Sequence, residues 1–321
     1  MKNKPILIIN GEPNSIFLEI FFKSLKYKKY NTPLILISSL KLLKLQMKKL
    51  KFNTDIKVID YKNINKFKLD RNCINLIDIK YKTHKAFEKI SKKSNLFIEN
   101  SFEIAFKLIN QGISNKLING PISKKNFLGK KYLGITEYLK SKSNSKTTAM
   151  LIYNKKLSVC PITTHLPIKM VAKKIKKKLL FEKVSLISEF YKIYRGFIPK
   201  IAVLGLNPHC ESIHKFNEDD KILKPAIKYL SKSGYKISGP FPSDTIFLAN
   251  NRKKFDVIVG MYHDQVLTPL KTLYEYDAIN ITLGLPFIRI SPDHGPNITM
   301  VGKNSSNPLS LINAIKFLDK N

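Results

Sequence analysis

The sequence is poor in cysteine. Its three cysteines, Cys73, Cys160 and Cys210, lie far apart and form no CxxC pair. Small secreted domains held together by disulfides contain an even and denser set of cysteines, and structural zinc sites of the knuckle type contain paired thiols. The sequence therefore indicates neither a disulfide framework nor a zinc knuckle, and we expect reduced thiols.

Long apolar runs are also missing. No stretch approaches the ~20 apolar residues that a membrane-spanning helix needs. The first apolar run is interrupted by Gly11, Glu12 and Pro13 before it reaches the length of a secretory signal. We therefore expect a cytoplasmic protein with no membrane partner. With 321 residues and 43% hydrophobic content, the chain can form one large domain or two of ordinary size.

Negative charge and arginine are scarce. Lys and Arg number 57 against 23 Asp and Glu, which gives a formal net charge of +34. Such an excess favours binding to nucleic-acid phosphates. However, lysine is spread over the whole chain, and a dedicated nucleic-acid site is expected to use arginine forks and stacking aromatics. We therefore expect no specific nucleic-acid partner. The arginines are Arg71, Arg195, Arg252 and Arg289.

Three common catalytic motifs are absent. The sequence has no GxGxxG, no GxxxxGK[ST] and no GxSxG. The usual dinucleotide-binding turn, a P-loop nucleotide hydrolase and a serine hydrolase elbow are therefore disfavoured.

Apolar runs alternate with helical patterns along the chain. This alternation predicts an α/β protein with a largely parallel sheet. In the lysine-rich segment 172–183, apolar residues at spacing four (Val171, Ile175 and Leu179) predict an amphipathic helix with a solvated lysine face. Strands are predicted at KPILIIN, TPLILIS, NKLING, TTAMLIY, KLSVCPI, KIAVLGL and FDVIVGM, and the longer helices at SIFLEIFFKSLKY, KLLKLQMKKLK, SFEIAFKLINQG, residues 167–194 and PLSLINAIKFLD.

Three histidines share one sequence context. His165, His209 and His263 each stand just beyond a strand-like apolar run. The carboxyl ends of strands border the ligand crevice in open α/β sheets, so these imidazoles can converge on one point. Three neutral imidazoles leave a divalent metal with open positions for substrate. A loop histidine that only satisfies local hydrogen bonds is the alternative for each of them.

Arg289 also follows a strand-like run. A planar guanidinium binds phosphate or carboxylate through two parallel hydrogen bonds, which indicates an anionic substrate, although a structural ion pair is the alternative. Cys210, beside His209, is interpreted as a small buried residue in preference to a thiolate nucleophile.

Several segments together resemble the 4-hydroxythreonine-4-phosphate dehydrogenase family of pyridoxal phosphate biosynthesis. They run in the family's order from residue 11 to 295, and TTHLP, MYHDQ and TLGLPFIR are the specific ones. The segments are GEPNSIFLE, INGPISK, GITEYL, TTHLP, LNPH, GPFPSDTIF, MYHDQVLTPLK and INITLGLPFIRIS with its trailing DHG.

The resemblance implies a role for individual residues. His165, His209 and His263 would bind one divalent metal per site, which is zinc, magnesium or cobalt. One ligand, His263, would come from the partner subunit of a homodimer with shared active sites. Asp244 is assigned as a helper for metal or proton handling. The implied contacts with the phosphorylated substrate are Thr136, Lys271, Asn280 and Arg289.

The resemblance also implies a fold and a reaction. The fold would be the two-domain isocitrate/isopropylmalate dehydrogenase type, with an active-site cleft between domains 1–125 with 270–321 and 126–269. NAD or NADP would oxidise 4-phosphooxy-L-threonine to 2-amino-3-oxo-4-phosphooxybutanoate, which decarboxylates to 3-amino-2-oxopropyl phosphate. NAD binding in this fold does not use GxGxxG, which agrees with its absence here.

The sequence departs from the family pattern at three places. Ile135 replaces a histidine that contacts substrate in the family, and isoleucine cannot donate a hydrogen bond. GEPNSIF lacks two family glycines, and CESIH follows LNPH where AGE is usual. These changes leave open a related phosphorylated hydroxy acid as substrate, such as a phosphothreonate or phosphoerythronate, or a weakened paralogue.

Overall fold

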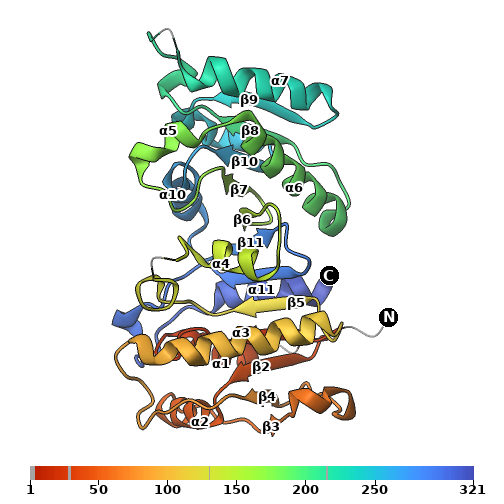
Figure 1. Ribbon diagram of the computed structural model, residues 1–321, viewed down its shortest axis with the longest axis vertical. Helices are drawn as coiled ribbons and strands as arrows, with labels where there is room; N and C mark the ends of the chain where they lie inside the picture. Colours follow the sequence, from red (N-terminus) through yellow and green to blue (C-terminus); the bar gives the residue numbers. More distant parts are fainter. Residues whose placement is uncertain (1–3, 28–29, 130, 215) are drawn as a thin grey trace. The chain divides into compact units, whose positions relative to one another are not determined.

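The computed structural model describes residues 4–27, 30–129, 131–214 and 216–321. The chain divides into two compact units, Met1–Tyr138 with Pro286–Asn321 and Leu139–Leu285 (Figure 1). The domain boundaries expected from the sequence, after residues 125 and 269, stay a prediction.

The first unit is built on a parallel sheet. Its strands follow the order β3-β4-β2-β1-β5-β12, and every neighbouring pair is parallel. Most residues of these strands are buried, and β1 is apolar along its whole length, as expected where helices cover both faces of a sheet. The strands are β1 (Ile6–Ile9), β2 (Leu34–Ser38), β3 (Ile56–Val58), β4 (Ile74–Asp78), β5 (Lys116–Asn119) and β12 (Ile288–Pro292).

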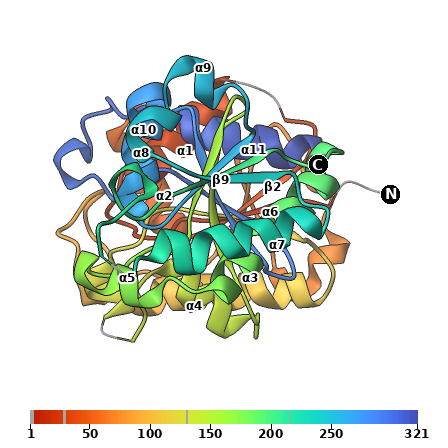
Figure 2. The ribbon, with the colours of Figure 1, turned by 90° about the horizontal axis from the view of Figure 1, so that it is seen from above.

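Helices cover both faces of this sheet. Figures 1 and 2 place α3 on one face, and α1 and α11 side by side on the other. Each helix turns an apolar stripe toward the strands. At the start of α2, the backbone N–H of Leu42 donates to the Ser39 hydroxyl, which caps the helix. The helices are α1 (Phe17–Tyr27), α2 (Leu40–Lys49), α3 (Asn95–Asn110) and α11 (Leu309–Lys320).

The second unit has a mixed sheet in the order β11-β6-β7-β10-β8-β9. β6 is antiparallel to both β11 and β7, whereas β7, β10, β8 and β9 run parallel. The mostly parallel α/β class predicted from the sequence is confirmed, and a strand lies in each predicted segment. The strands are β6 (Ala149–Tyr153), β7 (Ser158–Pro161), β8 (Ile201–Leu204), β9 (Ile237–Phe241), β10 (Val257–Gly260) and β11 (Ile279–Leu283).

The helices of this unit also lie on both faces of its sheet. Figure 2 shows α6 and α7 together on one side, with α8 and α10 on the other. No helix in the described ranges combines the length and apolarity needed to cross a bilayer. The helices are α4 (Ile135–Lys142), which leads in from the first unit, α5 (Val171–Lys174), α6 (Lys177–Arg195), α7 (Lys224–Lys232), α8 (Ser243–Ile246), α9 (Ala249–Arg252) and α10 (His263–Tyr274).

The prediction of one continuous helix over residues 172–183 is wrong. α5 ends at Lys174, Ile175 and Lys176 are extended, and α6 starts at Lys177. The break allows Ile175 to be buried, although it lies off the buried stripe that α6 forms from Leu180 onward. The lysine face itself is exposed as predicted.

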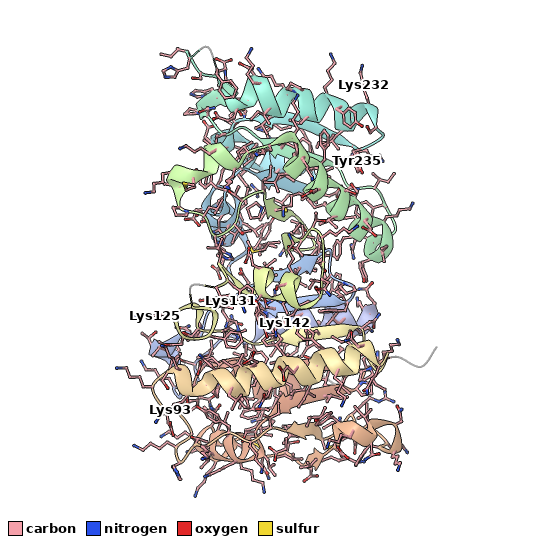
Figure 3. All side chains as sticks on the ribbon, in the orientation of Figure 1. Lys93, Lys125, Lys131, Lys142, Lys232 and Tyr235 are labelled. Carbon is pink, nitrogen blue, oxygen red and sulfur yellow. The ribbon has the colours of Figure 1, made fainter. Side chains whose placement is uncertain are left out.

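Lysine side chains extend into solvent from many elements. Figure 3 labels Lys93 and Lys125 in the first unit and Lys142 and Lys232 in the second, and all four are exposed. Because they come from separate turns and helices, the positive charge is distributed and does not follow a single element.

Candidate active site

The parallel strands of the second unit carry the predicted site residues just beyond their carboxyl ends. β7 leads to His165, β10 to His263, β8 to His209 and β9 to Asp244. The strand order β7-β10-β8-β9 therefore sets the order of these residues along one edge of the sheet. His165 and His263 follow adjacent strands, β7 and β10. Because neighbouring strands are about 4.8 Å apart, these two histidines can lie close together.

His165 and His263 lie next to each other. Their ring centroids are 6.1 Å apart, with the ring planes inclined by 38°. Both side chains are half-buried. Two imidazoles on one ion, each at a metal–nitrogen distance of about 2.0–2.1 Å, have ring centres roughly 5 Å apart. The observed separation of the two rings is about 1 Å larger than this value.

Asp264 orients the His263 ring. Nδ1 of His263 lies 2.6 Å from Oδ1 of Asp264, so the ring N–H donates to the carboxylate when the proton is on Nδ1. That tautomer leaves the Nε2 lone pair available as a ligand.

His209 is held in an unusual backbone conformation. It lies in a short 3₁₀ turn, η5 (Pro208–Cys210), with φ of +57°, and its side chain is exposed. In the described part of the chain its ring makes no hydrogen bond or ring contact. Left-handed conformations of non-glycine residues are uncommon and often mark functional positions.

The donor types fit a divalent metal, but the described residues of one chain do not complete its ligand set. Among them, no three His, Cys, Asp or Glu side chains lie close enough together to hold an ion. The His165 and His263 pair supplies two imidazoles. An ion at this edge therefore needs at least one ligand besides this pair.

Asp244 and Cys210 lie near the His209 loop. Asp244 is exposed in the first turn of α8. Burial raises the pKa of the Cys210 thiol, and the charges of Asp219 and Asp244 act in the same direction. Cys210 is buried and stays a thiol, which supports its interpretation as a small buried residue.

Two predicted substrate contacts belong to the second unit. Lys271 is exposed on α10, eight residues after His263 and so on the same side of the helix. Asn280 is half-buried on β11, and its buried Oδ1 has no hydrogen-bond partner within the described residues. An unsatisfied buried acceptor is unusual and fits a position that receives a hydrogen bond from a ligand.

The other two predicted contacts belong to the first unit. Thr136 is buried in the first turn of α4, and the half-buried Ile135 starts that helix. Arg289 is 1% exposed on β12, and its Nε donates to Oδ1 of Asn119 at 2.6 Å. Burial lowers the pKa of Arg289, but a guanidinium stays protonated at neutral pH, so this desolvated charge would be stabilised by an anion.

The remaining histidines lack this arrangement. His84 and His214 are exposed, and Nδ1 of His294 lies 3.0 Å from the carbonyl oxygen of Gly295.

A cavity in the first unit lies away from the strand ends that carry Asn10 and Asn119. It has a volume of about 240 Å³ and is lined by residues that include Tyr30, Thr32 and Asn72, at the amino ends of β2 and β4. Ligands of open α/β sheets bind at the carboxyl ends, so this cavity is not assigned to the reaction.

Two polar residues that hold the histidine loops, Gln265 and Asp219, were not identified from the sequence. Gln265 lies in the first turn of α10, directly before the buried Val266, and the segment MYHDQ that contains it was an available signal. Asp219 lies in the acidic run Glu218–Asp220, and composition does not distinguish it from its neighbours. Only the folded arrangement reveals the burial of this carboxylate.

Known proteins match this chain over almost its whole length. Residues 29–318 match the family model described as "Pyridoxal phosphate biosynthetic protein PdxA". A 4-hydroxythreonine-4-phosphate dehydrogenase from Sulfurihydrogenibium is 40% identical over 317 residues, which cover 97% of this chain and 96% of the relative. A D-threonate 4-phosphate dehydrogenase from Salmonella typhimurium is 32% identical over 320 residues, with 97% of each chain covered.

Two solved structures are also similar to this chain over almost its whole length. The structure described as a putative 4-hydroxythreonine-4-phosphate dehydrogenase from Salmonella typhimurium has a TM-score of 0.85 and 31% sequence identity, and the match covers 99% of each chain. A 4-hydroxythreonine-4-phosphate dehydrogenase from Klebsiella pneumoniae has a TM-score of 0.83 and 27% identity, with 98% of each chain covered.

Proposed function

The chain belongs to the PdxA family of oxidoreductases, and we propose that it oxidises 4-phosphooxy-L-threonine in pyridoxal 5′-phosphate biosynthesis. NAD or NADP accepts the hydride. The product is 2-amino-3-oxo-4-phosphooxybutanoate, a β-keto acid that decarboxylates to 3-amino-2-oxopropyl phosphate. The observation that carries the proposal is the pair of imidazoles, His165 and His263, 6.1 Å apart at the carboxyl ends of adjacent parallel strands.

His165, His209 and His263 form the proposed metal ligand set. These residues would hold a divalent ion, whether zinc, magnesium or cobalt, and the ion would supply Lewis acidity to lower the pKa of the substrate hydroxyl and to stabilise negative charge on the new carbonyl oxygen. Asp264 accepts a hydrogen bond from Nδ1 of His263, which leaves Nε2 as the nitrogen that would bind the ion. Asp244, at the end of the next strand but one, is available to handle a proton.

The proposed enzyme is a homodimer in which each site takes a ligand from both subunits. The resemblance assigned His263 to the partner. The contact between the His165 and His263 rings within one chain supports a different division, in which His209 is the ligand that the partner subunit contributes. His209 is exposed and makes no ring contact of its own in the described chain, so it is free to face a second subunit.

The remaining polar residues bind and orient the substrate. Lys271 and Arg289 provide positive charge for the phosphate, and a desolvated guanidinium interacts strongly with an anion. Asn280 offers an acceptor oxygen, and Thr136 offers a hydroxyl. No residue is assigned to the nicotinamide cofactor.

A second candidate substrate is D-threonate 4-phosphate or another phosphorylated hydroxy acid. It is favoured by Ile135, which replaces a hydrogen-bonding residue at the start of α4. The 32% identical relative named for D-threonate 4-phosphate covers the same share of this chain as the relative named for 4-hydroxythreonine 4-phosphate. The two substrates differ at C2, where one has an ammonium group and the other a hydroxyl group.

Purified protein tests the proposal directly. It is mixed with NAD or NADP and each phosphorylated substrate, and reduction of the nicotinamide is followed after chelation and after return of zinc, magnesium or cobalt. We expect metal-dependent reduction with 4-phosphooxy-L-threonine, and a higher kcat/KM for that substrate in Ile135→His. Turnover of D-threonate 4-phosphate alone supports the second candidate. Metal-bound protein that oxidises neither substrate would indicate a weakened paralogue.

A further inference from the structure

Gln265 connects three of the loops that follow the parallel strands of the second unit. Its Oε1 accepts a hydrogen bond from the backbone N–H of Met261 at 2.6 Å. Its Nε2 donates to the carbonyl oxygen of Gly205 at 2.8 Å and to the hydroxyl of Ser243 at 2.7 Å. One side chain thus joins the ends of β10, β8 and β9, which lead to His263, His209 and Asp244.

Thr163 extends this network to the fourth loop. Its backbone N–H and its hydroxyl both donate to the carbonyl oxygen of Met261, at 3.2 and 2.7 Å. Thr163 stands two residues before His165, and Met261 stands two residues before His263. The two neighbouring histidine loops are therefore tied together at equivalent positions.

Asp219 also holds the His209 loop, through hydrogen bonds to Leu206 and Asn207. Its carboxylate is 0% exposed. Oδ1 accepts from the N–H of Leu206 at 2.8 Å, and Oδ2 accepts from the backbone N–H and the side-chain amide of Asn207 at 3.0 and 2.8 Å. Leu206 follows Gly205, so Gln265 and Asp219 bind neighbouring residues of the same loop.

Two glycines make room for this network. A Cβ atom on Gly260 would lie 2.9 Å from Oε1 of Gln265, and one on Gly205 would lie 2.9 Å from Oδ1 of Asp219. Both distances are shorter than real Cβ contacts. The two polar side chains thus pack directly against the backbone at the strand ends, which restricts how far these loops can move.

We infer that Gln265 and Asp219 are positioning residues that hold His209 and His263 in place as metal ligands. The inference rests on the ligand set proposed above. Loops beyond strand ends have no ladder hydrogen bonds of their own, so the position of each imidazole depends on such contacts. Outer residues that orient metal ligands typically change metal affinity about 10–100-fold when they are replaced.

Cobalt(II) binding in the absence of substrate tests this inference, because the visible absorption of cobalt reports on ligand geometry independently of turnover. Gln265→Ala and Asp219→Asn each remove hydrogen bonds to the loops. Gln265→Glu is the conservative variant, which retains the acceptor for Met261 but loses the amide donors to Gly205 and Ser243. Matched controls are Asp220→Asn, an exposed neighbour with the same charge change, and Thr272→Ala, exposed on α10.

We expect Gln265→Ala and Asp219→Asn to weaken cobalt binding about 10–100-fold and to change its visible spectrum, with Gln265→Glu intermediate and both controls unchanged. A purely structural role would lower the melting temperature of the metal-free protein and leave the affinity and spectrum of the folded fraction unaltered. That result would overturn the inference and leave the proposed function intact. Wild-type protein that binds no cobalt would instead refute the ligand set, and the inference with it. If Gln265→Ala or Asp219→Asn does not fold, Gln265→Glu decides.

Discussion

His263 acts in combination with its immediate neighbours. Asp264 fixes one ring nitrogen, His165 faces the ring from the adjacent strand end, and the backbone of Met261 ties the loop to Gln265 and Thr163. His263 itself contributes little to the hydrophobic core, because its side chain is 36% exposed. Its removal should therefore affect ligand binding far more than folding.

His263→Ala should lose its metal while remaining folded. Removal of an imidazole ligand is expected to weaken metal binding by more than about 100-fold, because even loss of an outer partner costs about 10–100-fold. The free energy of unfolding should change by less than about 1 kcal/mol, because the half-buried ring makes few core contacts. Metal content after dialysis and thermal melting check this, with the exposed His84→Ala as the control. Unchanged metal content would refute the assigned ligand.

Glu12 should make stability depend on pH. It is buried, and its Oε1 accepts from Ser94 and from the N–H of Asn14. Burial raises its pKa above the ordinary value of 4.5. A raised pKa in the folded state means that the favourable contribution is present below the unfolded pKa and is lost as pH rises through the folded pKa. At neutral pH the ionised carboxylate therefore destabilises the fold.

Glu12→Gln keeps the Oε1 acceptor and removes the buried charge. We expect this variant to melt at a higher temperature than wild type at pH 7, with the difference shrinking as pH falls toward 4.5. Melting curves across this pH range measure the effect, and the exposed Glu99→Gln is the control. A constant difference at every pH would argue that the Glu12 charge is not its source.

At the scale of secondary structure, much of the site could be predicted from the sequence. Apolar runs marked the strands, and polar residues beyond them marked the ligand edge. The pairing of His165 with His263 could not be predicted, because it depends on β7 and β10 being adjacent although about a hundred residues separate them. The contacts of Asp219 and Gln265 were also hidden, since they are made to backbone groups of distant loops.

Gly205→Ala tests how tightly the end of β8 is packed. The added Cβ would lie 2.6 Å from Sγ of Cys210 and 2.9 Å from Oδ1 of Asp219, so the His209 loop must shift. Overpacking of this kind costs about 1–3 kcal/mol of unfolding free energy. Chemical denaturation and metal titration should show lower stability and weaker binding together. Gly295→Ala, where a Cβ meets open space, should change neither. An unaltered Gly205→Ala protein would mean that the loop tolerates displacement.

At the scale of the whole molecule, the incomplete ligand set within one described chain leads to the proposed dimer. In a dimer with shared sites, the histidines of one subunit are divided between the two sites. If His165 and His263 serve one site and His209 serves the partner's site, a mixed dimer can keep one intact site even when each subunit carries a defect. The pattern of rescue then identifies which histidine crosses the interface.

Mixing inactive variants should therefore restore activity selectively. When His209→Ala and His165→Ala subunits are dissociated and reassociated at random, about half of the dimers are mixed, and each mixed dimer has one intact site of two. The expected activity is about one quarter of wild type. His209→Ala with His263→Ala should behave in the same way, whereas His165→Ala with His263→Ala should recover nothing, because those two residues belong to one site. Rescue in this last mixture, with none in the first, would show that the partner contributes His263. Absence of rescue in all three would mean that each chain builds its site alone.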